Sequence, residues 1–123
     1  MQKKPRKILV VDDEPVIRDM MADILEVEGY TVEVTRNGRE ALEKLSRSDN
    51  YLVFLDLLMP VMDGRELCQQ LNARPEVRMQ HVVVIMSALD QLAQVSSLHI
   101  DETMPKPFVV DDVLRIIQSY MPE

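Results

Sequence analysis

Five side chains that could do chemistry stand at the ends of short candidate strands. They are three acids, one hydroxyl and one lysine: Asp12, Asp13, Asp56, Ser87 and Lys106. If the fold brings them together, the three carboxylates repel one another near a low-dielectric core, and one lysine offsets only part of that repulsion. A divalent cation would offset the rest, and Mg²⁺ suits a few carboxylates with waters and a phosphate. An aspartyl phosphate needs the same parts: a carboxylate nucleophile, fixed cations and a hydroxyl donor.

The stretches that precede these residues are predicted to be strands. Residues 7–11, 51–56 and 82–86 are apolar or β-branched almost throughout, which is typical of strands buried on both faces of a parallel sheet. An alternating segment at 31–35 and a short one at 102–104 predict two further strands.

Apolar residues at helical spacing separate the strands and predict five helices. Pro15 begins the first helix and Gly29 ends it. Asn37 begins the second, and Glu40 three residues later suggests a capping box. The remaining helices are predicted between Gly64 and Pro75, over 88–98 and from Val110 onward.

This alternation of strands and helices predicts an α/β fold. The most economical arrangement is a flavodoxin-like, doubly wound, five-stranded parallel sheet of order 2-1-3-4-5 with five helices. The order puts the first, third and fourth strands side by side, so the acids and the hydroxyl at their ends meet at one edge of the sheet.

Length, charge and cysteine content narrow the function classes. The 123 residues predict a single domain, 1–123, with 1–6 as a flexible N-terminal tail. A net charge of −7 argues against direct nucleic-acid binding, and no apolar run approaches the roughly 20 residues that span a bilayer. One cysteine, Cys68, excludes an internal disulfide and is expected to pack on a helix, so we expect a cytoplasmic chain. His81 and His99 lack partners at metal-ligand spacing, which favours loop or surface roles.

Four motifs together resemble the receiver domain of two-component response regulators, including the chemotaxis-regulator type. They are VVDDEP at 10–15, FLDLLMPVMDG at 54–64, VIMSA at 84–88 and PKPF at 105–108, in the family's order and near its spacing. The resemblance covers nearly the whole chain. Each motif alone is weak, but the combination is specific.

The resemblance implies a role for each residue of the candidate site. Asp56 would be the phospho-acceptor, and Mg²⁺ would be bound by Asp13 and Asp56 directly, by Asp12 through water and by the backbone carbonyl of Leu58. Apolar Leu58 and Leu89 would flank the path of hydrolytic water, and because they offer it no hydrogen bond, we expect a long-lived phosphoryl group.

The last two motifs carry the switch and the fixed cation. Ser87 would be the switch hydroxyl, and Lys106 would contact the phosphoryl group, with a cis peptide bond between Lys106 and Pro107. The family's second switch position usually holds an aromatic residue, and here it is Thr103.

The region between Ser87 and Lys106 departs from the family in length as well. It spans 19 positions, short by nearly one helical turn, and His99 replaces the usual glycine before the fifth strand. Because these departures fall on the family's usual output face, we hypothesise that the output surface lies elsewhere, on the first helix or the 57–63 loop.

The leading interpretation is therefore a phospho-acceptor module of a two-component phosphorelay. It would take a phosphoryl group from a histidine kinase or histidine phosphotransfer protein, alter its affinity for an unknown downstream protein, and catalyse only its own phosphorylation and dephosphorylation. The expected state is a monomer or a weak phosphorylation-dependent dimer, without membrane or nucleic-acid contact. With no effector domain after Glu123, we expect a single-domain regulator or an excised receiver.

Two alternatives remain open at this point. One is a pseudo-receiver that docks partners without phosphorylation, which the intact acid, hydroxyl and lysine set disfavours. The other is a small Mg²⁺-dependent aspartyl-phosphate phosphatase. A second acid two residues after Asp56 would favour it, but Leu58 stands there.

Overall fold

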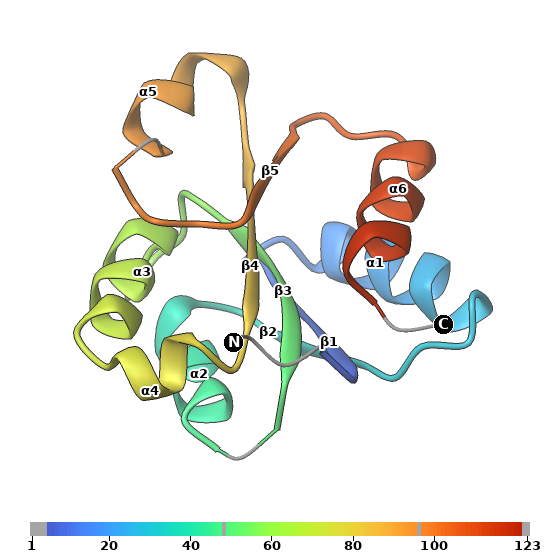
Figure 1. The fold of residues 1–123 in the computed structure, drawn as a ribbon. Coiled ribbons are helices and arrows are strands. Elements are labelled where there is room, and N and C mark those ends of the chain that lie inside the picture. The colour runs from blue at the N-terminus through green and yellow to red at the C-terminus, as the bar shows by residue number, and fades with distance from the viewer. Residues whose placement is uncertain (1–4, 48, 96, 122–123) are drawn as a thin grey trace.

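The sheet has the predicted strands in the predicted order. A computed structural model describes residues 5–47, 49–95 and 97–121. Five parallel strands run in the order β2-β1-β3-β4-β5 (Figure 1). Their bounds are β1 (Lys7–Val11), β2 (Val32–Thr35), β3 (Tyr51–Asp56), β4 (Val82–Ser87) and β5 (Glu102–Pro105).

Helices cover both faces of this sheet. They are α1 (Pro15–Val27), α2 (Gly38–Leu45), α3 (Gly64–Asn72), α4 (Pro75–Arg78), α5 (Leu92–Val95) and α6 (Val110–Tyr120), with a 3₁₀ turn η1 (Leu89–Gln91) before α5. α1 and α6 pack on one face, and α2 to α5 pack on the other (Figure 1). This is the doubly wound arrangement expected from the alternating pattern.

Two hydrophobic clusters, one on each face, hold the layers together. Every residue of β3 and β4 is buried, which explains why these runs are apolar throughout. Along β3, Val53 and Leu55 belong to the cluster under α2 and α3, while Leu52 and Phe54 belong to the cluster under α1 and α6. The period-two alternation of a strand thus feeds both cores from one segment.

The prediction of five helices missed α4. Pro75 was expected to mark the end of the third helix, but it also begins a new one-turn helix, because the first turn does not need the N–H that proline lacks. Val77 anchors this turn by packing into the α2–α3 cluster.

The helix predicted over 88–98 is shorter and less regular than expected. Among the described residues of this stretch, only Leu89–Gln91 and Leu92–Val95 are helical, the first as 3₁₀. The shortening agrees with the 19-position spacing between Ser87 and Lys106. The chain returns to β5 through His99, whose φ of 53° is the left-handed conformation that glycine adopts most easily.

Helix ends mostly follow the predicted signals. Gly29, with φ of 92°, follows the end of α1. Asn37 caps α2 by accepting from the backbone N–H of Glu40 at 3.0 Å. The second half of the predicted capping box is absent, because the Glu40 carboxylate accepts instead from the N–H of Arg36. Cys68 packs on α3 as predicted.

His81 lies in the loop before β4, as predicted, but it is not at the surface. Its side chain is fully buried beside the start of β4. Nδ1 accepts from the backbone N–H of Tyr51 at 3.2 Å, and Nε2 lies 2.8 Å from the Leu45 carbonyl oxygen. Partners far along the sequence therefore satisfy this histidine, and a local pattern does not reveal them.

The fold holds Pro5 and Arg6, the last two residues of the tail predicted over 1–6. Pro5 is buried, and the Arg6 N–H donates to the Asn50 carbonyl at 3.0 Å. Residues 1–4 lie outside the described residues.

Candidate functional site

The carboxyl edge of the sheet gathers the five predicted side chains. Asp56 and Ser87 are the last residues of β3 and β4, and Asp12 directly follows β1. Lys106 directly follows β5, and its N–H donates to the Ser87 carbonyl at 3.0 Å. The parallel order of the strands thus brings residues 94 positions apart in sequence into contact.

Three carboxylates cluster at this edge. Oxygen atoms of Asp12, Asp13 and Asp56 lie within 4.8 Å of one another. Asp12 is fully buried, Asp56 is nearly so and Asp13 is exposed. Asp12 is held in place by the N–H of Glu14, which donates to Oδ1 at 2.9 Å.

Lys106 is the cation of the cluster. Its Nζ lies 3.1 Å from Asp56 Oδ1 and 3.2 Å from Asp12 Oδ2. Burial lowers the pKa of Lys106, but the carboxylates of Asp56 and Asp12 outweigh burial, so the pKa is raised and the ammonium stays charged.

Asp56 is the electrostatically strained member of the set. Burial and the neighbouring Asp12 raise its pKa to about 6, against the lowering effect of Lys106. Additional positive charge near Asp56 would stabilise its ionised form, and a carboxyl whose pKa is raised this far is typical of functional sites.

Backbone contacts fix the loop that follows Asp56. Gly64 N–H donates to the Leu57 carbonyl at 2.9 Å. A Cβ at Gly64 would lie 2.6 Å from the Asp56 carbonyl oxygen, so only glycine allows α3 to start this close to β3.

A polar pocket of about 280 Å³ opens at the cluster. Its lining comprises Asp13, Glu14, Asp56, Leu58, Ala88, Gln91 and Lys106. Ser87 Oγ, at the end of β4, is buried without a hydrogen-bond partner among the described residues. A buried hydroxyl without a hydrogen-bond partner, at the end of a strand that borders this cluster, is available to donate to an oxygen-rich ligand.

The comparisons with known proteins match this geometry. Residues 8–118 match the family described as the response regulator receiver domain. The chain belongs to this family. Response regulator MprA of Mycolicibacterium vanbaalenii is 34% identical over 120 residues, which cover 95% of this chain and 51% of MprA. The receiver chain therefore spans about half the length of that relative.

Solved receiver structures agree in fold. The Vibrio cholerae chemotaxis protein CheY4 superposes with a TM-score of 0.81 at 26% identity, over 95% of this chain and 99% of CheY4. Response regulator TrrA of Thermotoga maritima, solved in complex with Mg²⁺-BeF, gives 0.79 at 30% identity, over 93% and 97% of the two chains. The receiver fold predicted from the motifs is confirmed.

The residues of this receiver domain fit Mg²⁺. Asp12, Asp13 and Asp56 offer oxygen donors only, at mutual distances that one ion can span. The Leu58 backbone borders the same pocket. The charge of the site also favours binding of a cation, because Lys106 is the single lysine beside the three carboxylates of this cluster.

The remaining predicted positions lie in or near the site. The Lys106–Pro107 peptide bond is cis. Thr103 is half-buried on β5, in register with Ile85 of β4, while Ser87 is in register with Pro105. The side chain of Leu89 lies outside the described residues. No helix in the described part of the chain is long and apolar enough to cross a membrane.

Sequence reasoning gave no role to three residues that line the pocket, Glu14, Ala88 and Gln91. Gln91 accepts a hydrogen bond from the Ala88 backbone N–H through Oε1 at 3.0 Å. The spacing of three between a helix-start position and Gln is half of a capping box, and this signal could have found it.

Proposed function

We propose that Asp56 of this receiver domain accepts a phosphoryl group from a phosphohistidine and that the modification changes partner binding. The observation that carries the proposal is the placement of Asp56, which lines a polar pocket 3.1 Å from Lys106. The neighbouring strand β4 ends in Ser87, whose buried hydroxyl has no hydrogen-bond partner among the described residues. We further propose that the chain, 1–123, acts as one receiver module.

Each residue has a step in the transfer. An Asp56 carboxylate oxygen forms the new P–O bond as the P–N bond of phosphohistidine breaks, and the electron pair of that bond stays on the imidazole nitrogen. Lys106 holds the incoming phosphoryl oxygens by charge, and the Ser87 hydroxyl donates to one of them. Positioning and charge, not covalent chemistry by other groups, lower the barrier.

Mg²⁺ would be held by the carboxylates of Asp13 and Asp56, by Asp12 through water, and by the Leu58 carbonyl. When bound, it supplies positive charge that neutralises the carboxylates and the transferred group. The clustering of three acids around one lysine supports this assignment.

The proposed partners follow from the family. The donor is a histidine kinase or a histidine phosphotransfer protein, and a downstream protein reads the modified state in the cytoplasm. The chain itself is a monomer or a weak phosphorylation-dependent dimer, and it turns over no free substrate beyond its own phosphorylation and dephosphorylation.

Incubation with acetyl phosphate and Mg²⁺ tests the proposal by intact-mass measurement. The wild type is expected to gain one phosphoryl group, and Asp56→Asn is expected to gain none. Asp19→Asn is the matched control, because Asp19 is an exposed acid on α1 away from the pocket; it is expected to behave as wild type.

Other outcomes select the alternatives. A folded wild-type protein that gains no mass with acetyl phosphate or with phosphorylated kinase overturns the proposal and favours a phosphorylation-independent docking module. Release of inorganic phosphate in large molar excess over protein favours a phosphatase.

A further inference from the structure

One polar donor in the pocket is already occupied. The Ala88 N–H, directly after β4, donates to Gln91 Oε1 at 3.0 Å, and the Gln91 N–H donates back to the Ala88 carbonyl at 2.9 Å. Both residues line the pocket together with Asp56 and Lys106. Gln91 is therefore both a residue of η1 and part of the wall that faces the acceptor carboxylate.

The neighbouring donor, the Ser87 hydroxyl, differs from the Ala88 N–H. Ser87 Oγ is buried and has no partner in the described part of the chain. The end of β4 therefore carries two consecutive donors. The Ser87 hydroxyl has no acceptor among the described residues, and the Ala88 N–H is hydrogen-bonded to the Gln91 side chain. A group with several acceptor oxygens on Asp56 would enter the pocket that Ala88 lines, directly after Ser87 in the chain, and would compete with Gln91 for the Ala88 N–H.

We propose that Gln91 is a displaceable latch: its side-chain oxygen holds the Ala88 N–H until the group acquired by Asp56 takes that N–H and releases Gln91. This inference rests on the proposed function and adds a device that reports occupancy of the site. A charged oxyanion is a stronger acceptor than a neutral amide, so the exchange favours the occupied site.

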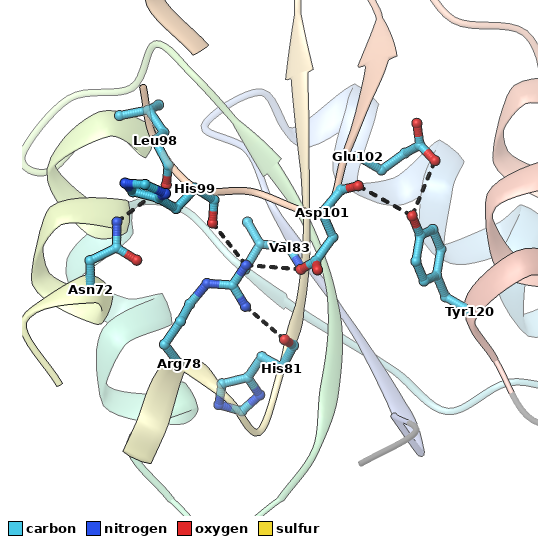
Figure 2. Close-up of polar contacts among 9 residues, drawn as sticks. All are labelled: Asn72, Arg78, His81, Val83, Leu98, His99, Asp101, Glu102 and Tyr120. Atoms are coloured by element: carbon cyan, nitrogen blue, oxygen red, sulfur yellow. Dashed lines mark hydrogen bonds and ion pairs between the residues drawn. The ribbon is translucent and has the colours of Figure 1, made fainter. Parts of the chain in front are cut away.

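Loss of the hydrogen bond from Ala88 to Gln91 would affect the segment formed by η1 and α5, which follows Ala88. Contacts with neighbouring helices hold the far end of this segment. Arg65 Nη2 lies 3.3 Å from Gln94 Oε1, and Asn72 Nδ2 donates to the Leu98 carbonyl at 3.2 Å. Figure 2 shows the Leu98 anchor and the adjacent bond from Arg78 to the His99 carbonyl. The segment is thus tied to α3 and α4 at its far end and held near the site by Gln91.

This arrangement gives a route from Asp56 to the surface that does not require an aromatic residue at 103. When the Gln91 side chain no longer accepts from the Ala88 N–H, η1 (Leu89–Gln91) loses its N-terminal cap. The helix that follows, Leu92–Val95, then changes its position or order relative to α3. Thr103 need not move for this signal to form.

Nuclear magnetic resonance of the full chain tests the latch directly. Beryllofluoride with Mg²⁺ serves as the probe for the phosphoryl group. We expect the Gln91 side-chain amide signals to shift toward those of a free, mobile amide at saturation, with a large shift of the Ala88 N–H. The side-chain signals of Gln118, an exposed glutamine on α6 outside the pocket lining, serve as the internal control and are expected to change less. Unchanged Gln91 side-chain signals at saturation would overturn the latch.

Two variants test it energetically. Gln91→Ala removes the competing acceptor, and Gln91→Asn keeps an amide that is one methylene too short to reach. Both are expected to bind beryllofluoride about two- to tenfold more tightly than wild type, the range that corresponds to one net hydrogen bond. Gln118→Ala, the same change at an exposed glutamine of α6 outside the pocket lining, is expected to leave the affinity unchanged. Wild-type affinity in both Gln91 variants would contradict the latch.

The two proposals fail differently. If the latch is wrong but the proposed function is right, the wild type still binds beryllofluoride and still gains mass with acetyl phosphate. If the wild type does neither, both proposals fail together.

Discussion

Lys106 pairs with two carboxylates from different strands at once, at 3.1 Å from Asp56 and 3.2 Å from Asp12. Asp13 adds a third carboxylate to the same cluster. One positive charge therefore faces three acids, and two of those acids are almost completely buried. The site is destabilised by its own charge until a cation arrives, which is the expected condition of a metal-binding edge.

Replacement of Asp56 by Asn is expected to stabilise the metal-free protein. It removes one buried carboxylate that burial and Asp12 disfavour, and we expect about 1 to 3 kcal/mol more free energy of unfolding at pH 7. Urea denaturation in EDTA measures this. Added Mg²⁺ is expected to stabilise the wild type more than Asp56→Asn, and Asp19→Asn is expected to follow the wild type. A less stable Asp56→Asn would show that the cluster is already balanced without metal.

The buried His81 predicts a loss of stability at mildly acidic pH. Burial lowers the pKa of His81 below its usual 6.5. The unfolded chain therefore binds a proton near pH 6.5 that the folded chain refuses, so this contribution is complete above pH 6.5 and is lost as pH falls toward the folded pKa. The slope approaches about 1.4 kcal/mol per pH unit for one proton.

Comparison of wild type with His81→Gln isolates that slope from other titrating groups. Urea unfolding at several pH values from 5 to 7.5 is the measurement. The stability difference between the two proteins is expected to shrink as pH falls below 6.5. His99→Gln, the same replacement at an exposed histidine, is the control. Its free energy of unfolding is expected to change with pH as in the wild type, because His81 is retained. A difference that stays constant with pH would contradict a buried neutral His81.

The fold was predictable because it depends on local composition that repeats along the chain. Residues 51–55 are apolar or aromatic throughout because β3 is covered on both faces, and that is visible in the sequence. The candidate site was predictable for a related reason. Acids directly after such runs must lie at the carboxyl edge of a parallel sheet.

The features that sequence reasoning missed depend on contacts between distant segments. His81 reads locally as a loop residue, and only the approach of Leu45 and Tyr51 makes burial favourable. The pair Arg78 and Asp101, at 2.9 Å, ties α4 to the entry of β5 in the same region (Figure 2). The sequence around Arg78 does not indicate that it pairs with Asp101, and the sequence around Asp101 does not indicate Arg78.

Substitution of His99 by Gly is expected to stabilise the protein. His99 is exposed, its φ is 53°, and a side chain in this conformation costs roughly 1 kcal/mol relative to glycine, partly offset by the greater freedom of glycine in the unfolded chain. We expect a net gain of about 0.5 to 1 kcal/mol in urea unfolding. The backbone carbonyl that accepts from Arg78 is unaffected. Ala73→Gly, at an exposed position whose φ is −73°, is the control and is expected to be destabilising.

The apolar wall of the pocket predicts a long-lived phosphoryl group. Leu58 is 56% exposed and lines the pocket beside Asp56, where it offers an attacking water no hydrogen bond. Leu58→Asn supplies one, and a bond of ordinary net strength formed in the transition state speeds hydrolysis up to about tenfold. The decay of the phosphorylated mass after removal of acetyl phosphate measures the rate. Val61→Asn is the matched control, because Val61 is exposed in the same loop but is not part of the pocket lining. Equal lifetimes for wild type and Leu58→Asn would show that another residue limits access of water to Asp56.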